Sequence, residues 1–209
     1  MASPKVARYR IQRRLGVELP GLGKAGALER RPYPPGQNGN KRRKFSDYAL
    51  RLEEKQKIRN HYVLREAQLR RFIRQAKTGS GANWTSKLMG LLETRLDNLV
   101  FRLGWAPSIR SARQLVGHGF VMIDGKKVNI GSVVVKPGQK ITLSEKGTKN
   151  QIYLHAKQSP RLPEIPDFIR REGEGVNEVG TVQSLPGTEM VPFTFDAGLF
   201  TEYYAARNV

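Results

Sequence analysis

A short stretch near the middle of the chain sets the expected fold. Residues 95–144 read RLDNLVFRLGWAPSIRSARQLVGHGFVMIDGKKVNIGSVVVKPGQKITLS. Apolar residues first recur at helical spacing, as in Leu96, Leu99 and Leu103, and after Gly119 they alternate with a period of two. A helical period followed by an alternating one predicts two helices packed on a small antiparallel sheet. We therefore expect an α+β fold.

Turn signals divide the alternating part into strands. Asp124-Gly125 is a strong two-residue hairpin signal, and Pro137-Gly138 marks a second turn. The alternating residues predict strands at 121–123, 128–130, 133–135 and 141–143.

The second predicted helix presents a candidate binding face. Ser108 is a good N-cap and Gly117 is a stop signal, so the helix is expected at 109–116. The side chains expected to face inward are Ile109, Ala112, Leu115 and Val116. Those expected on the outer face are Arg110, Arg113 and Gln114, which makes that face polar and cationic.

A longer helical region precedes this stretch. From the N-cap Ser46 to Lys77 the chain has neither Gly nor Pro, and we expect one long helix, or two with a break near Asn60-His61. The second half has an apolar stripe of Leu69, Phe72, Ile73 and Ala76. A cationic stripe lies on another face, at Arg70, Arg74 and Lys77. Residues 84–104 are expected to be helical again, with Gly90 dividing the run.

The two ends of the chain differ in composition. Residues 1–45 are basic and rich in Gly and Pro, so we expect an extended arm without regular structure. Residues 157–192 are rich in Pro and Gly and are expected to form loops and short strands. The final residues predict a short helix around 199–206.

The charge of the chain favours a polyanionic partner. Lys and Arg total 37 and Asp and Glu total 18, so the formal net charge is +19. This charge is uneven, with net +15 over residues 1–77, +7 over 78–150 and −3 over 151–209. Because such an excess repels itself, nucleic acid is the first candidate partner and an acidic membrane surface the second. We expect the binding surface in the first two blocks.

The sequence also excludes several classes of site. The chain has no cysteine, which rules out disulfides, cysteine nucleophiles, iron–sulfur clusters and cysteine-based zinc sites. No apolar run reaches the roughly 18 residues of a membrane span. The basic N-terminus is not followed by the apolar stretch of a secretory signal. We therefore expect a cytoplasmic protein that is not an enzyme and that needs no cofactor and no metal.

The order of short motifs in the central stretch points to a family. These motifs are Arg95-Leu96-Asp97, Phe101-Arg102-Leu103-Gly104, Ser108, Ala112-Arg113-Gln114-Leu115-Val116-x-His118-Gly119, Asp124-Gly125-Lys126 and Gly138-x-x-Ile141. Together they resemble the S-four RNA-binding domain. The flanks extend the resemblance to the bacterial small-subunit ribosomal protein S-four family, through Pro35-Gly36-Gln37, Ser46-Asp47-Tyr48 and Phe200-Thr201-Glu202-Tyr203-Tyr204. Many members bind zinc through a cysteine cluster, so this chain resembles the cysteine-free branch.

The resemblance implies a division of the chain into four parts. It places a basic extended arm at 1–45 and a helical domain at 46–92, which the C-terminal tail 187–209 joins. The RNA-binding module, with two helices and a small antiparallel sheet, occupies 93–156. A Pro- and Gly-rich extension at 157–186 is expected to pack on the module.

The resemblance also implies a function. Members of the family are structural components of the small ribosomal subunit that bind its ribosomal RNA directly and nucleate assembly of the body. They lie near the channel where messenger RNA enters, beside ribosomal protein S-five, and contribute to decoding accuracy. The implied partners are therefore small-subunit ribosomal RNA, messenger RNA and neighbouring small-subunit proteins, with no membrane and no small-molecule substrate.

The residues expected to contact RNA come from three parts of the chain. Those in the arm are Arg8, Arg10, Arg13, Arg14, Lys41, Arg42, Arg43 and Lys44, and those in the helical domain are Arg70 and Arg74. Those in the module are Arg95, Ser108, Arg110, Ser111, Arg113, Gln114, His118, Lys126 and Lys127. These residue types suit a folded RNA junction, which is recognised mainly through phosphates and shape. We expect Asp97 to orient a neighbouring arginine, while packing and RNA contact stay equally open for His118.

Other classes of protein remain as alternatives. Some RNA-modifying enzymes contain the same module beside a large catalytic domain, but only Pro-rich, acidic sequence follows the module here. Small RNA-binding factors that rescue stalled ribosomal subunits usually lack a basic arm and helical domain like those at 1–92. A membrane-surface protein is a further alternative, although the apolar residues Leu69 and Phe72 are better used in a core.

Overall fold

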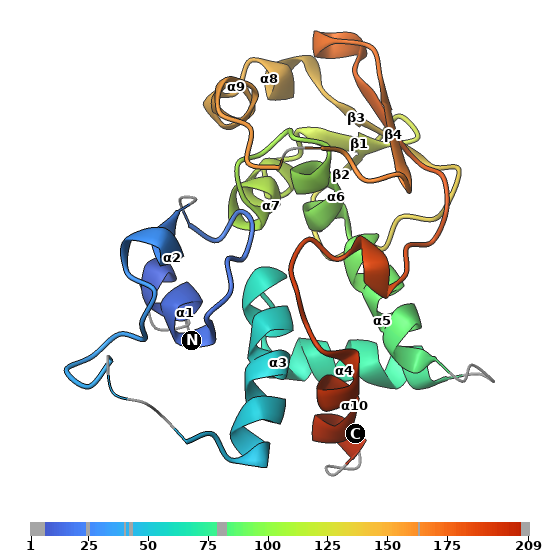
Figure 1. Cartoon of the computed structure of the whole chain (residues 1–209). Coiled ribbons are helices and arrows are strands. Elements are labelled where there is room, and N and C mark those ends of the chain that lie inside the picture. The colour runs from blue at the N-terminus through green and yellow to red at the C-terminus, as the bar shows by residue number, and fades with distance from the viewer. Residues whose placement is uncertain are drawn as a thin grey trace. The chain divides into compact units, whose positions relative to one another are not determined.

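The chain forms two compact units in the computed structural model shown in Figure 1. The structure describes residues 7–23, 26–39, 41, 44–78, 83–162 and 164–205. The first unit runs to Arg71 and resumes at Pro192, and the second runs from Phe72 to Val191. The first boundary therefore falls between Arg71 and Phe72, whereas the resemblance implied a boundary at position 92.

Two helices form the centre of the first unit. α3 (Asp47–His61) and α4 (Glu66–Lys77) are separated by a turn in which Val63 has a φ of +52°. The hydroxyl of Ser46 accepts a hydrogen bond from the backbone N–H of Ala49, as expected of an N-cap. The prediction of two helices with a break near residue 60 is thus confirmed.

The C-terminal helix returns to this unit. α10 (Ala197–Ala205) lies beside α3 in Figure 1 and confirms the short helix predicted at the end of the chain. Arg51 of α3 donates to Glu202 at 2.7 Å, and the backbone N–H of Asp196 donates to Glu54 at 2.9 Å. These contacts join segments far apart in the sequence, so only tertiary structure could reveal them.

The basic arm contains helices, which corrects the prediction of an extended arm. α1 (Arg8–Leu15) ends at Gly16, whose φ of +63° suits a helix C-cap, and a single turn, α2 (Ala27–Arg30), follows. Gln12 is buried and donates to the carbonyl of Leu19. The segment that Gln12 contacts is irregular, and residues 1–45 carry no helical period that predicts α1.

The second unit begins with further helices. α5 (Trp84–Glu93) and α6 (Leu96–Arg102) replace the single divided run expected at 84–104. Gly90 lies inside α5, and the break falls after Glu93 instead. The break is tertiary in origin, because Val135 donates its backbone N–H to the carbonyl of Thr94 at 2.9 Å.

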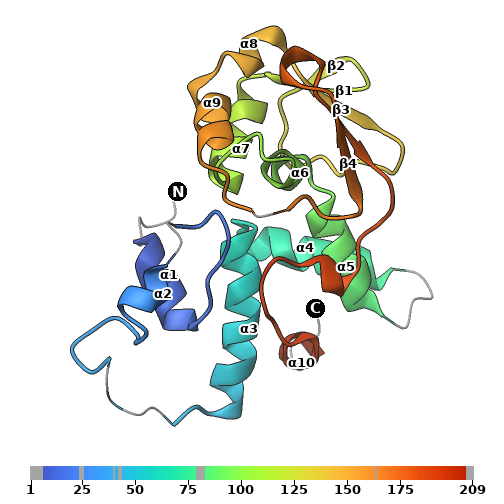
Figure 2. The ribbon, with the colours of Figure 1, turned by 45° about the horizontal axis from the view of Figure 1, so that its top comes forward.

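The third helix of this unit confirms its prediction. α7 (Ile109–Gly117) begins after Ser108, whose hydroxyl accepts from the backbone N–H of Ser111 at 3.1 Å. The four side chains expected inside are buried, namely Ile109, Ala112, Leu115 and Val116. In both views α6 and α7 lie on the same side of the sheet (Figures 1 and 2).

The sheet is antiparallel and larger than expected. Its strands are β1 (Val121–Ile123), β2 (Lys126–Val128), β3 (Lys140–Leu143), β4 (Ile169–Glu172) and β5 (Val179–Val182). They lie in the order β2-β1-β3-β5-β4. The expected hairpin joins β1 to β2, with positive φ at Asp124 and Gly125, as a type I′ turn requires. The α+β fold class is confirmed.

Two features of the sheet differ from expectation. Residues 133–135 form no ladder, because Val134 makes only an isolated bridge to Arg95. The extension contributes β4 and β5, which add two strands to the sheet beside β3. In β5, a side chain at Gly180 would place its Cβ against the buried Leu103, the C-cap of α6, so the close approach of this residue to the sheet requires glycine there.

Short helices complete the second unit. α8 (Glu145–Thr148) and α9 (Gln151–Gln158) follow β3, and the single 3-10 turns are η1 (Gly175–Asn177) and η2 (Thr188–Met190). Asn150 caps α9 by accepting from the backbone N–H of Ile152 at 2.9 Å. This capping fixes the start of α9. The helix lies mostly before residue 157, in a stretch for which no element was predicted, and only its last two residues enter the segment expected to form loops and short strands.

Candidate nucleic-acid interface

The outer side of α7 carries exposed polar side chains. Arg110 and Gln114 are exposed, while Arg113 is about two-fifths exposed at 39% of its side-chain area. The prediction that they lie outside the buried stripe is confirmed. Ser108 and Ser111 are more enclosed, and their hydroxyls hydrogen-bond to each other at 2.9 Å. Ser108 therefore acts as a helix cap.

A buried carboxylate lies beneath this side of the helix. Asp97 is fully buried and accepts two hydrogen bonds from Arg95, at 3.0 and 2.8 Å, and two from Arg113, at 3.0 and 2.7 Å. We call Arg95, Asp97 and Arg113 the Asp97 cluster. The expectation that Asp97 orients an arginine is confirmed, because bidentate contacts hold a planar guanidinium in one orientation.

The structure corrects the expectation that Arg95 contacts RNA. Its side chain is only 2% exposed, and its guanidinium lies 5.4 Å from the centre of the Phe72 ring. A cation enclosed between a carboxylate and an aromatic ring has no path to an RNA phosphate. Its place in the motif suggested that Arg95 binds RNA, but its burial gives it a structural role.

The β1–β2 hairpin presents two further cations. Lys126 and Lys127 are exposed, and within the described residues neither forms an ion pair. Asp124 anchors the turn, since its carboxylate accepts from the backbone N–H of Lys140 at 2.9 Å and from Gln139 at 3.0 Å. The hydrogen bond from the Lys140 backbone, followed by that from Gln139, holds the pKa of Asp124 below its ordinary value.

The loop after the hairpin rests on the Asp97 cluster. The carbonyl of Gly131 accepts from the backbone N–H of Asp97 at 3.0 Å. A Cβ at Gly131 would lie 3.2 Å from the Cβ of Asp97 and 3.5 Å from the Cγ of Arg113. The hairpin and α7 are therefore connected through a packed loop. We call Arg110, Arg113, Gln114, Lys126 and Lys127 the module face.

His118 follows α7 and is exposed. Its ring makes an edge contact with Phe120, with the ring centres 5.8 Å apart. The structure thus gives His118 a packing partner and also leaves it accessible, so both of the expected roles stay open.

The other predicted contacts lie in the arm and in α4. Arg8, Arg10 and Arg14 are exposed along α1, and Lys41, Lys44 and Arg74 are exposed as well. Arg13 is different, because it donates to the carbonyl of Tyr33 at 2.9 Å and its guanidinium lies over the Tyr33 ring at 4.9 Å. Arg70 pairs with Glu66 at 3.5 Å. Arg42 and Arg43 lie outside the described residues.

Three cations of the second unit were absent from the predicted set. Lys157, Arg161 and Arg171 line a pocket at the end of α6. They were overlooked because the last block of sequence has a net charge of −3, which suggested that this block does not face RNA. The adjacent pair Arg170 and Arg171 was the available signal.

The structure offers little support for other kinds of site. Across the described ranges, no group of three or more His, Asp or Glu side chains is arranged to hold a metal ion. Among the same residues, no helix is both long enough and apolar enough to cross a membrane.

Comparison with known proteins agrees with this picture. The model of the ribosomal protein S4/S9 N-terminal domain matches residues 5–93, and that of the S4 domain matches residues 94–141. Small ribosomal subunit protein uS4B of Bdellovibrio bacteriovorus is 57% identical, over 98% of both chains. The uS4 proteins of Nostoc sp. and Methylobacillus flagellatus are each 45% identical over 96% of both chains. The chain therefore belongs to the uS4 family of ribosomal proteins, as the order of its motifs indicated.

Proposed function

We propose that the chain is a structural component of the small ribosomal subunit, located with the ribosome in the cytoplasm, that binds small-subunit ribosomal RNA and catalyses no reaction. The module face is the observation that carries this proposal. It presents exposed cations from a capped helix and a tight hairpin, so few conformations are lost when RNA binds. The names of the relatives at 57% and 45% identity point to the same role.

The chemistry of the module face suits phosphate recognition. Arg110 offers a planar, bidentate donor, and Lys126 and Lys127 offer point charges on the hairpin. Arg113 is held by Asp97, and 39% of its side-chain area stays exposed. A rigid array of this kind reads the spacing of phosphates, which is how proteins recognise folded RNA without reading base edges.

Finer parts of the role rest on the family. We propose that the protein binds early and nucleates assembly of the body, lies near the channel where messenger RNA enters, contacts ribosomal protein S-five and contributes to decoding accuracy. The exposure of Lys41 and Lys44, just before the N-cap Ser46, supports a contact with passing RNA.

Binding to purified small-subunit RNA tests the main proposal. Arg110→Glu combined with Lys126→Glu and Lys127→Glu should weaken binding strongly and flatten the salt dependence, since each phosphate contact contributes about 0.9 to the slope of log K against log salt on duplex RNA. Lys146→Glu, at an exposed position of α8, is the matched control. A triple variant that keeps the affinity and salt slope of the wild type would contradict the proposal.

Translation in reconstituted ribosomes tests the contact with messenger RNA. Replacing Lys41, Arg42, Arg43 and Lys44 with Ala should leave assembly intact, because the other basic sites remain. It should slow translation of messengers with stable hairpins more than that of unstructured ones, because cations that hold single strands favour unwinding. Equal slowing on both kinds of messenger would leave these residues with a ribosomal RNA contact only.

A further inference from the structure

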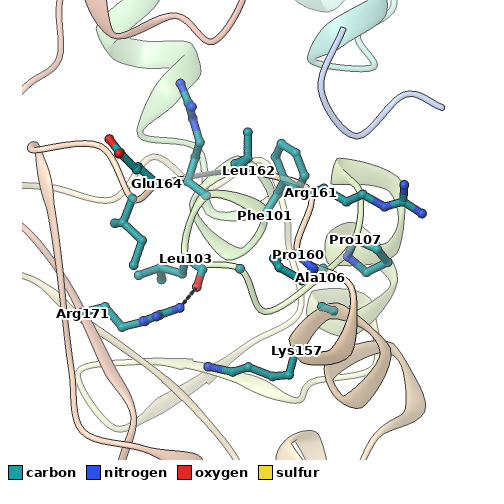
Figure 3. A pocket seen from close by; sticks show the side chains of 14 residues that line it. Phe101, Leu103, Ala106, Pro107, Lys157, Pro160, Arg161, Leu162, Glu164 and Arg171 are labelled. Carbon is teal, nitrogen blue, oxygen red and sulfur yellow. Dashed lines mark hydrogen bonds between the residues drawn. The ribbon is translucent and has the colours of Figure 1, made fainter. Parts of the chain in front are cut away.

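A pocket in the second unit lies apart from the module face. It has a cavity volume of about 260 Å³ and opens between the end of α6, the segment that follows α6, and α9 with the residues after it (Figure 3). This volume is close to the lower limit of small-ligand pockets, which suits one small group better than an extended ligand.

One wall of the pocket is apolar. Leu103 and Ala106 form its buried floor, and Pro107, Leu162 and Ile165 are half-buried at its sides. Contact between this apolar surface and water is unfavourable, so binding of a flat, apolar group that covers the surface is favoured. The wall therefore favours a ligand with an uncharged, weakly hydrated body.

The opposite wall is cationic. Figure 3 shows Arg171 reaching from β4 to the carbonyl of Leu103, a hydrogen bond of 2.9 Å, with Lys157 of α9 nearby. Lys157 and Arg171 share one buried carboxylate, that of Glu178, at 2.7 and 3.3 Å. Two cations thus have one buried counter-ion, and positive charge is left over on this wall.

The buried carboxylate is well fixed. The hydroxyl of Tyr153 donates to Glu178 at 2.7 Å. Burial, and then the hydrogen bond and charge of Glu178, raise the pKa of Tyr153 above its ordinary value, so the hydroxyl remains a donor. Glu178 therefore sets the positions of the Lys157 and Arg171 head groups before any ligand arrives.

Arg161 adds a cation that has no such counter-ion. It lines the pocket on the side of Pro107 (Figure 3), is half-buried, and forms no ion pair with any of the described residues. The rim carboxylate of Glu164 is exposed, so water screens its charge. An apolar wall facing an excess of cations matches a ligand that joins a flat apolar body to an anion.

We propose that this pocket receives one unstacked nucleotide of the bound RNA, with its base against Leu162 and Pro107 and its phosphate at Arg161. This inference rests on the proposed RNA binding and adds a site outside the module face. Recognition of a splayed base by an apolar surface, together with an arginine on its phosphate, is typical of the single-stranded parts of folded RNA.

Two variants separate the base contact from the phosphate contact. Leu162→Trp fills the cavity and should weaken binding to small-subunit RNA by about tenfold, the size of one lost base contact, without changing the salt slope. Arg161→Ala should flatten the salt slope by about 0.7 to 0.9, the share of one phosphate. Lys136→Ala, an exposed cation that does not line the pocket, is the matched control for Arg161→Ala.

Chemical probing of RNA 2′-hydroxyl groups identifies the nucleotide. In the complex with the wild-type protein, one nucleotide should change its reactivity, and Leu162→Trp should abolish that change while Lys136→Ala preserves it. A thermal melt verifies that each variant is folded. If Leu162→Trp fails to fold, Pro160→Trp, at an exposed position on the rim, fills the pocket in its place.

The outcomes distinguish this inference from the proposed function. If folded pocket-filling variants keep the wild-type affinity and reactivity pattern while Arg110→Glu weakens binding, the pocket holds no nucleotide and the RNA-binding function stands. If the wild-type protein itself shows no binding to small-subunit RNA at low salt, the proposed function fails, and this inference fails with it.

Discussion

Arg95 and Arg110 belong to the same domain and fifteen positions separate them, yet they are used in opposite ways. Arg95 is 2% exposed and bonded to Asp97, whereas Arg110 is exposed on α7. Arg113 is intermediate between them, because its guanidinium is bonded to Asp97 while 39% of its side-chain area is exposed. The comparison shows that the position of a buried carboxylate, rather than the type of the basic residue, decides which cations are available to RNA.

The physical reason lies in the cost of burying charge. An isolated buried ion costs several kcal/mol, so Asp97 must be compensated wherever it lies. Arg95 supplies that compensation from inside and Arg113 from the surface. The neighbouring pair of Glu93 and Arg102, joined at 2.9 Å, repeats the arrangement at the other end of α6. Exposed cations are solvated by water and therefore need no protein counter-ion.

The largest expected effect is on the Asp97 cluster. Asp97→Asn should lower the free energy of unfolding by about 3–5 kcal/mol, because it leaves the buried Arg95 without its counter-ion. Urea denaturation measures this, with Asp124→Asn as an exposed control that should change it far less. If Asp97→Asn lowers the free energy of unfolding by less than about 1 kcal/mol, the buried ion pair contributes no more than an exposed one, which would contradict the comparison.

Effects of intermediate size are expected for substitutions of Arg110 and Arg113, and they should differ between the two residues. Arg110→Met should leave the free energy of unfolding within about 0.5 kcal/mol of the wild type and flatten the salt slope of RNA binding by one phosphate, about 0.9. Arg113→Met should affect both quantities, since it removes a hydrogen-bonded partner of Asp97.

Urea denaturation and salt titration of the two variants together make the measurement. A stability loss for Arg110→Met that equals or exceeds that for Arg113→Met would mean that the outer side of α7 is assigned wrongly.

The smallest expected effect concerns the hairpin at low pH. The folded-state pKa of Asp124 lies below its unfolded value, so its charge stabilises the fold above the unfolded pKa of about 3.9 and that contribution is lost as the pH falls through the folded value. Asp124→Asn should therefore be slightly less stable than the wild type at pH 7, and the difference should shrink below pH 4.

Urea midpoints at pH 7 and pH 3 check this prediction. Because Asn also tolerates a positive φ, the turn is retained and the comparison isolates the charge. A difference that grows on acidification would reverse the sign of the argument.

Local signals predicted much of the structure correctly. The stripe of Ile109, Ala112 and Val116, the Ser108 cap and the Asp124-Gly125 turn each specify an element through neighbouring residues alone. The same holds for the break between α3 and α4. Such features depend on backbone propensity and on which face is apolar, both of which are encoded within a few turns of chain.

Long-range contacts account for the elements that were wrong or missing. α1 is joined to the irregular segment after it by the hydrogen bond from Gln12 to the carbonyl of Leu19, a contact that no period predicts. β5 pairs with β3 across the intervening α8 and α9, and β4 pairs with β5. Short strands were predicted in this region, but their pairing with the sheet was not. Residues 133–135 looked like a strand but give their backbone bonds to the break between α5 and α6.

By itself, the sequence determined the α+β class, the excess of positive charge and the polar outer side of α7, because these follow from composition and from local periodicity. The family followed from the resemblance of its ordered motifs. Only the tertiary structure decided that Arg95 is buried and Arg110 exposed, and that Lys157, Arg161 and Arg171 meet around one pocket. The reason is that burial and charge compensation depend on groups brought together from distant parts of the chain. A local sequence pattern does not predict which carboxylate pairs with which cation.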